Sequence, residues 1–165
     1  MQVREALPNE IPIIHTLARK IWMDHYPSII SMEQIEYMLE KMYSEVALQQ
    51  QLTDGHRFFI LSDEKSDLGY LSFSQTEKGN YFLHKFYIDT KHHRKGLGHF
   101  FFDTVFNAIH DLKTIRLTVN RTNLKAINFY FKKGFIIEEV KDFDIGNNYF
   151  MNDFVMLYIP TLHKN

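Results

Sequence analysis

The stretch from Tyr81 to His110 combines two hydrophobic periods. Apolar residues alternate with a period of two as far as Ile88, which predicts a β-strand. From about Phe101 they recur at helical spacing, which predicts a helix that ends at His110. The two faces of the predicted strand carry Phe82, His84, Phe86 and Ile88 on one side, and Tyr81, Leu83, Lys85 and Tyr87 on the other.

A basic loop with two glycines, Lys91–His99, joins the predicted strand to the predicted helix. The first N–H groups of a helix lack internal partners and carry the positive end of the helix dipole. Gly96 and Gly98 omit the Cβ atoms that would keep a bulky anion away, and Arg94 and Lys95 add positive charge. The loop therefore suggests a pyrophosphate cradle. An ordinary strand-to-helix connection explains it equally well, because G-x-G alone is a weak motif.

The N-terminal part predicts a short strand, Gln2 to Ala6, followed by helices. Three helices are expected there, each with its own N-cap residue: Asn9 for a helix from about Glu10 to before Pro27, Ser31 for residues 32–42, and Ser44 for a helix to about Leu52.

After Gly55 most of the pattern is that of strands. Strands are expected at residues 57–62, 68–74, 114–120, 135–143 and 149–159, with a helix between the third and fourth that is capped by Thr122 or Asn123 and ended by Gly134. A helical crossover would make the central strand and the strand at 114–120 parallel. The predicted fold class is therefore α/β, a mixed sheet flanked by helices in one domain, residues 1–165.

The composition of the chain excludes several classes of function. The net charge of −1 gives no support to a role on nucleic acid or on anionic membranes. The chain has no cysteine, which excludes a thiol nucleophile and Cys-ligated zinc. No histidines and carboxylates share one element at metal-ligand spacing, so no metal is expected. No signal segment or membrane span is visible, and we expect a cytoplasmic protein.

Two motifs resemble the GCN5-related N-acetyltransferase (GNAT) family. HRKGLG at residues 93–98 is similar to the family's Q/R-x-x-G-x-G/A loop, although His93 stands where Gln or Arg is usual and Arg94 where Gly is common. NLKAINFYFKKGF at residues 123–135 is similar to the family's N-x-x-A-x-x-F-Y-x-x-x-G-F segment. The C-terminal segment DFDIGNNYFMNDFVMLYIP resembles the last hairpin of PaiA-like small-amine acetyltransferases. The resemblance implies a twisted, mostly antiparallel sheet of about seven strands with a splayed parallel pair.

The resemblance also implies a site for acetyl-CoA. The pyrophosphate would lie on the backbone of the loop, and the pantetheine arm along the central strand, facing Leu117 to Asn120 across the splay. Tyr130 matches the family's tyrosine that protonates the leaving thiolate, although a core tyrosine is the alternative. The residues implied for cofactor binding are Phe86, Tyr87, Ile88, His93, Arg94, Lys95, Gly96, Leu97, Gly98, His99, Asn123 and Tyr130.

His84 is the candidate base, because several family members place a glutamate near this position and an imidazole titrates near neutral pH. A histidine with only a structural role, with proton loss directly to water, is the alternative. Acceptor recognition is expected from carboxylates and aromatic residues in two variable regions: Trp22, Asp24, His25, Tyr26 and Tyr37 in the helical region, and Asp144, Tyr149 and Asp153 in the last hairpin.

The leading hypothesis is an acetyl-CoA-dependent N-acetyltransferase that acts on a primary amine of a small molecule, such as a polyamine or an amino compound. One alternative acceptor is a protein N-terminus or lysine. A second alternative is a CoA-binding sensor without catalysis, and a general nucleotide-phosphate binder is a weaker one. A homodimer that pairs through the last strands is possible.

Overall fold

The computed structural model describes residues 1–89, 91 and 96–160. The chain divides into two compact units, and β4 (Asn80–Ile88) runs through both. The first unit holds Met1–Ser74 and Lys85–His110, and the second holds Gln75–His84 and Asp111–Asn165. None of the helices in the described residues is both long and apolar enough to span a bilayer.

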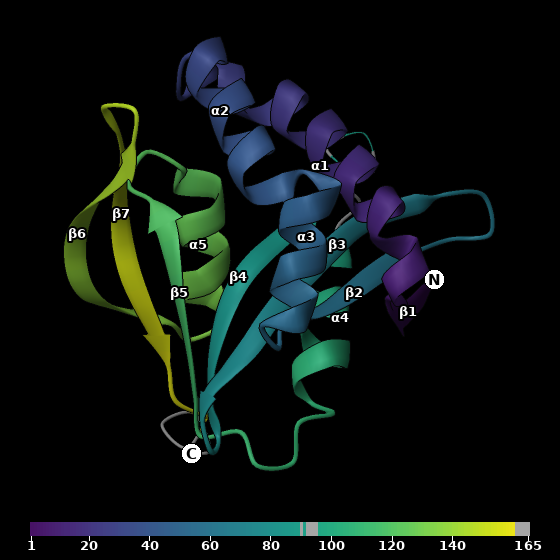
Figure 1. The fold of residues 1–165 in the computed structure, drawn as a ribbon. Coiled ribbons are helices and arrows are strands. Elements are labelled where there is room, and N and C mark those ends of the chain that lie inside the picture. Colours follow the sequence, from purple (N-terminus) through teal and green to yellow (C-terminus); the bar gives the residue numbers. More distant parts are fainter. Residues whose placement is uncertain (90, 92–95, 161–165) are drawn as a thin grey trace. The chain divides into compact units, whose positions relative to one another are not determined.

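The first unit joins an antiparallel sheet to helices. Its strands are β1 (Gln2–Glu5), β2 (Arg57–Ser62), most of β3 (Asp67–Glu77) and the end of β4, and its helices are α1 (Ile11–His25), α2 (Met32–Tyr43), α3 (Glu45–Thr53) and α4 (Leu97–Phe106). Short 3-10 turns, Pro8–Glu10 and Tyr26–Ser28, flank α1. β1 and β3 both run antiparallel to β2, with Val3 opposite Leu61 and Phe59 opposite Leu71 (Figure 1).

Helices cover both faces of this sheet, because its strands carry apolar side chains on both sides. On one face Tyr70 of β3 packs against Tyr43 of α2, with 6.2 Å between ring centroids. On the other face Phe73 of β3 packs against Phe106 of α4 at 5.4 Å. The alternation continues on β4, where Phe86 lies 5.8 Å from Phe101 of α4. The side chains of Lys85 and Tyr87 therefore belong to the face that α2 covers.

The second unit is built on the start of β4 together with β5 (Thr114–Asn120), α5 (Leu124–Lys132), β6 (Ile136–Gly146) and β7 (Tyr149–Tyr158). β4 and β5 are parallel from Asn80 opposite Thr114 to Leu83 opposite Leu117. β7 runs antiparallel to both β5 and β6 (Figure 1). The strand order is β1-β2-β3-β4-β5-β7-β6, which confirms the predicted mixed, mostly antiparallel sheet with one parallel pair.

Most predicted helix caps are confirmed. The N–H groups of Gln34 and Ala47 donate to the hydroxyls of Ser31 and Ser44, and the Ala126 N–H donates to the Asn123 side chain. The prediction for Asn9 was wrong. That residue lies inside the first 3-10 turn, so the residue before α1 is Glu10, whose carboxylate instead accepts from the Leu7 N–H at 2.9 Å.

Three predicted boundaries were also wrong. β6 ends at Gly146, three residues beyond the predicted end, and the other two shifts are at α4 and β3. α4 ends at Phe106 and does not reach His110, because the Ile109 N–H donates to the carbonyl of Phe106 in a tighter i to i−3 turn. β3 extends to Glu77, three residues beyond the predicted end, because the hairpin continues outward as an exposed ribbon. None of these shifts changes which residues precede α4 or follow β4.

Candidate active site

The start of α4 has the backbone conformation of an anion cradle. Gly96 is the residue before the helix and has φ +96°, a left-handed conformation that favours glycine. A Cβ added there would meet no described residue within 4 Å, so the space beside it is open as far as the described residues reach. The first helical bond is donated by Phe100 to Gly96 O, so the N–H groups of Leu97 and Gly98 precede the first hydrogen bond of the helix. No acidic residue lies in this first turn to compete with an anion.

The structure describes only some of the loop residues that were predicted to bind the cofactor. Leu97, Gly98 and His99 form the first turn of α4 after the N-cap Gly96, whereas the sequence pattern placed them in the loop. His93, Arg94 and Lys95 lie outside the described residues.

The end of β4 packs against α4 and β3 within the first unit. Phe86 packs on Phe101 and Phe102 of α4, and Tyr87 packs on Tyr70 of β3 at 5.3 Å. Backbones approach closely here, since a Cβ on Gly69 would lie 2.4 Å from the carbonyl oxygen of Tyr87. The ladder between β4 and β5 ends at Leu83 and Leu117, although β4 continues to Ile88 and β5 to Asn120.

Tyr130 lies in α5 and Asn123 directly precedes that helix, both in the second unit. Tyr130 is buried against Phe129 and Phe135, with ring centroids 5.4 and 5.3 Å away. Burial raises the pKa of its phenol, so the hydroxyl keeps its proton at neutral pH. That is the state a proton donor requires. Asn123 fills the N-cap position through its side-chain oxygen, at 3.2 Å from the Ala126 nitrogen.

His84 is half-buried in the second unit, with its ring 4.9 Å from that of Phe82. Because side chains alternate along a strand, His84 shares the face of Phe82 and Phe86, while Lys85 lies on the opposite face.

The structure brings together only some of the predicted acceptor residues. Trp22 and Tyr26 stack at 4.3 Å, and both approach Tyr87. Tyr37 instead accepts a hydrogen bond from Lys41 along α2, and Asp144 accepts from the Gly146 N–H in the last hairpin.

Asp153 is a buried carboxyl on β7. Its burial raises its pKa to about 6, although a hydrogen bond with the Thr118 side chain opposes that shift.

Lys85 is a buried lysine with a lowered pKa, and it was not among the predicted site residues. It is only 6% exposed, and burial lowers its pKa from 10.5 to about 8. A sequence signal did exist, because a lysine interrupts an otherwise apolar face of the central strand, between Leu83 and Tyr87.

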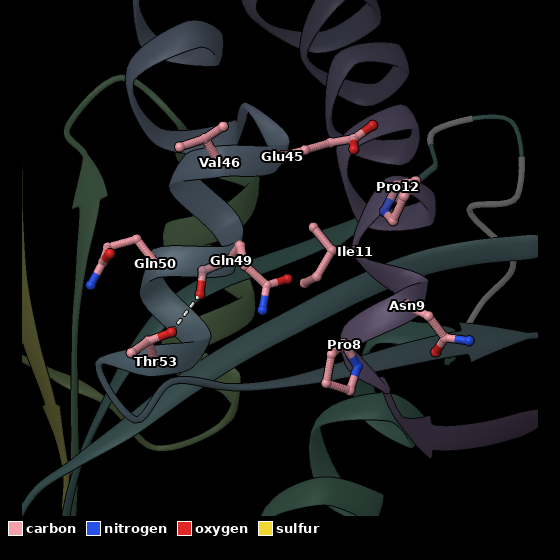
Figure 2. Close-up of a pocket in the computed structure, with 9 residues that line it drawn as sticks. All are labelled: Pro8, Asn9, Ile11, Pro12, Glu45, Val46, Gln49, Gln50 and Thr53. Atoms are coloured by element: carbon pink, nitrogen blue, oxygen red, sulfur yellow. Dashed lines mark hydrogen bonds between the residues drawn. The ribbon is translucent and has the colours of Figure 1, made fainter.

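A separate groove of about 500 Å³ lies in the first unit between the start of α1 and α3 (Figure 2). Its lining residues are Pro8, Asn9, Ile11, Pro12, Glu45, Val46, Gln49, Gln50 and Thr53. Glu45 is the one ionisable side chain in that lining, and none of the predicted site residues is among them. Within the described residues, no group of three His, Asp or Glu side chains is arranged to hold a metal ion.

Comparison with known proteins identifies the family. The family model for the acetyltransferase (GNAT) domain matches residues 28–145, which is more than half of the chain. The chain therefore belongs to the GNAT family, and its activity class is acetyl-CoA-dependent N-acetyl transfer. No curated protein sequence is similar enough to this chain to count as a match.

Solved structures agree with the family at the level of the fold. PaiA N-acetyltransferase from Thermoplasma acidophilum, in complex with coenzyme A, has a TM-score of 0.79 at 21% identity, with 96% of this chain and 98% of that chain covered. A GCN5-related N-acetyltransferase from Rhodopseudomonas palustris has a TM-score of 0.78 at 14% identity, covering 96% and 94%. Ard1 from Thermoplasma volcanium has a TM-score of 0.69 at 21% identity, covering 96% of both chains.

Proposed function

We propose that this enzyme transfers the acetyl group of acetyl-CoA to a primary amine of a small molecule, and that the N-terminus of α4 holds the diphosphate of the cosubstrate. The observation that carries the cosubstrate site is the open space beside Gly96 among the described residues, together with the amides of Leu97 and Gly98 that precede the first hydrogen bond of the helix. Side chains of His93, Arg94 and Lys95 are proposed to add contacts to the same phosphates.

Acetyl-CoA supplies the acetyl group already activated as a thioester. In this proposal the backbone of Phe86, Tyr87 and Ile88 orients the pantetheine arm, and Asn123 lies near it in addition to its capping role. A neutral amine is needed for attack, yet an alkyl ammonium has a pKa of about 10. We assign proton removal to His84, directly or through water, and proton donation to the leaving thiolate to the Tyr130 hydroxyl.

The buried aromatic residues near the end of β4 support a small acceptor. Trp22 and Tyr43 are 2% and 3% exposed, so the side chains that could recognise an amine are enclosed. A protein N-terminus or lysine, the second candidate acceptor, needs an open surface groove.

We also propose a homodimer. β6 is the last strand in the sheet order and exposes Ile136 and Val140, at 52% and 58%. An exposed apolar edge strand is a template for pairing with another chain. Light scattering that gives a monomeric mass at micromolar concentration would remove this part.

The cosubstrate site is tested by comparing two glycines. Gly55 has φ +90° and, like Gly96, nothing within 4 Å of an added Cβ, so Gly55→Ala is a matched control for backbone strain. Both alanine variants should lose similar stability. Only Gly96→Ala should weaken coenzyme A binding, by about tenfold or more in calorimetry. Equal affinities in the two variants would contradict the assignment.

Activity is tested by thiol release across a panel of amines. The chain has no cysteine, so a thiol-reactive dye reports only the coenzyme A that is released. We expect turnover with small primary amines and little with peptides. No turnover with any amine would overturn the proposed function.

A further inference from the structure

Lys85 is a buried cation that has no counter-ion among the described residues. Its ammonium lies 4.8 Å from the centroid of the Tyr43 ring. In the part of the chain that the structure describes, no carboxylate or hydrogen-bond acceptor reaches it. Asp89, the buried acid that directly follows β4, forms an ion pair with Lys20. A buried charge is expensive unless an opposite charge or hydrogen bonds compensate it.

Five aromatic rings surround this region, and we call them the aromatic cluster: Trp22, Tyr26, Tyr43, Tyr70 and Tyr87. Trp22 lies 5.1 Å from Tyr43 and 6.0 Å from Tyr87, and Tyr70 lies 5.3 Å from Tyr87. The rings come from α1, the 3-10 turn after it, α2, β3 and β4, so the cluster forms only when these elements pack together.

Among the described residues, two buried polar atoms of the cluster make no hydrogen bond of good geometry, although Trp22 and Tyr43 lie near enough to Tyr70 to influence its pKa. They are the indole nitrogen of Trp22 and the hydroxyl of Tyr70. The indole N–H and the Lys85 ammonium can donate hydrogen bonds but cannot accept them. Burial raises the pKa of both Tyr43 and Tyr70, so these hydroxyls also keep protons to donate. Among the described side chains of the cluster the acceptors are tyrosine hydroxyl oxygens, so the cluster is rich in donors and offers Lys85 no anionic acceptor.

The aromatic cluster reaches the surface at one end. Tyr26 and Tyr87 are half-buried there, and their hydroxyls meet at 3.3 Å, a long hydrogen bond. Tyr26 lies on the 3-10 turn Tyr26–Ser28, which is three residues long. A ligand that reaches the donors behind these two rings would displace this weak contact among others.

We propose that the acceptor of this enzyme carries a carboxylate as well as its amine, and that Lys85 binds the carboxylate inside the aromatic cluster. The inference rests on the proposed small-amine function and names its substrate class: a zwitterionic amino acid. One ammonium matches one carboxylate, since the nearby His56 has its pKa lowered by burial and by Lys85 and stays neutral. A polyamine would place a second cation beside a buried one, which repels it.

Burial and charge agree with this assignment. The pKa of Lys85, about 8, leaves most of the side chain protonated at neutral pH. A bound carboxylate also supplies an acceptor for the orphan N–H and O–H groups of Trp22 and Tyr70.

The fluorescence of Trp22 gives a direct binding assay, because it is the sole tryptophan of the chain. We would titrate the enzyme, loaded with coenzyme A, with glycine, L-alanine and 4-aminobutanoate, and with the amide of each. The carboxylates should change the fluorescence saturably, with a dissociation constant at least tenfold lower than that of the amides. Equal affinity for acids and amides in the wild type overturns the inference.

Variants of Lys85 locate the effect. Lys85→Met should abolish the preference for carboxylates and leave amide binding unchanged, and Lys85→Arg should restore part of it. Lys65→Met, at an exposed position in the turn between β2 and β3, is the matched control and should behave as wild type. A preference that survives Lys85→Met overturns the assignment of the residue. If neither Lys85 variant folds, the wild-type titration still decides whether a carboxylate binds.

The outcomes separate this inference from the function beneath it. The inference is overturned if putrescine and amino-acid amides support thiol release as efficiently as amino acids do, in both wild type and Lys85→Met. That result leaves the proposed acetyl transfer to small amines intact. If no amine supports thiol release, the proposed function is overturned, whatever the fluorescence shows.

Discussion

Replacing Lys85 by methionine should make the protein more stable at neutral pH. The side chain is buried on the central strand with no counter-ion among the described residues. Methionine keeps a similar length and an apolar body but removes the charge. We therefore expect a substitution that damages ligand recognition to strengthen the fold, as occurs where a functional site holds a group that the fold disfavours.

The size of the gain follows from the pKa. The pKa of Lys85 falls from 10.5 to about 8 in the folded protein, and each tenfold change is worth about 1.4 kcal/mol, so protonation costs the folded state about 3 kcal/mol. Methionine loses the contact between the ammonium and the Tyr43 ring, which is worth about 1 kcal/mol. The net increase in the free energy of unfolding at pH 7 should be about 2 kcal/mol.

The pH dependence gives the sign check. The unfolded lysine binds its proton below pH 10.5, while the folded one does so only below about 8. Stability of the wild type should therefore rise between pH 8 and 10.5, where the unfolded state binds more protons. The advantage of Lys85→Met is full below pH 8 and fades toward pH 10.

Urea unfolding followed by circular dichroism, at pH 7 and at pH 10, measures both quantities. Lys65→Met, which removes an exposed charge, corrects for the change in net charge. A variant that is less stable than wild type at pH 7, or a gain that is the same at both pH values, would refute the reasoning.

Three further predictions concern single groups. Tyr130→Phe should lower the rate of acetyl transfer at least tenfold while coenzyme A affinity stays the same in calorimetry, and an unchanged rate would remove its role as acid. His84→Gln should flatten the acidic limb of the kcat/KM profile, since the neutral imidazole is the form that accepts a proton; an identical profile would assign proton loss to water. Asp153→Asn should stabilise the protein by about 1 kcal/mol at pH 7, because the pKa of the buried carboxyl is raised from 3.8 to about 6 and the folded state resists its ionisation. That gain should fade as the pH falls through 6 to 4 in urea titrations, and a gain that persists at pH 4 would contradict the cause.

Some features of the fold follow from short-range patterns. Strands β2 and β5 begin and end where alternation predicts, because a period of two and the flanking turn residues are local properties. Ser31, Ser44 and Asn123 cap helices as predicted, since a cap bonds within three residues of itself. The prediction that Asn9 caps α1 was wrong because a contact from another element intervenes. The Glu10 carboxylate accepts hydrogen bonds from Arg4 of β1 and from the Leu7 N–H.

The sequence by itself determined the family, the order of the elements and the glycine loop that opens α4. These depend on residues close together in the chain, whose spacing carries the chemistry of the helix terminus. Only the tertiary structure decided that Lys85 is a buried cation and that Trp22, Tyr26, Tyr43, Tyr70 and Tyr87 meet. Burial and desolvation arise when distant elements pack, and no local pattern states which polar group will be left without a partner.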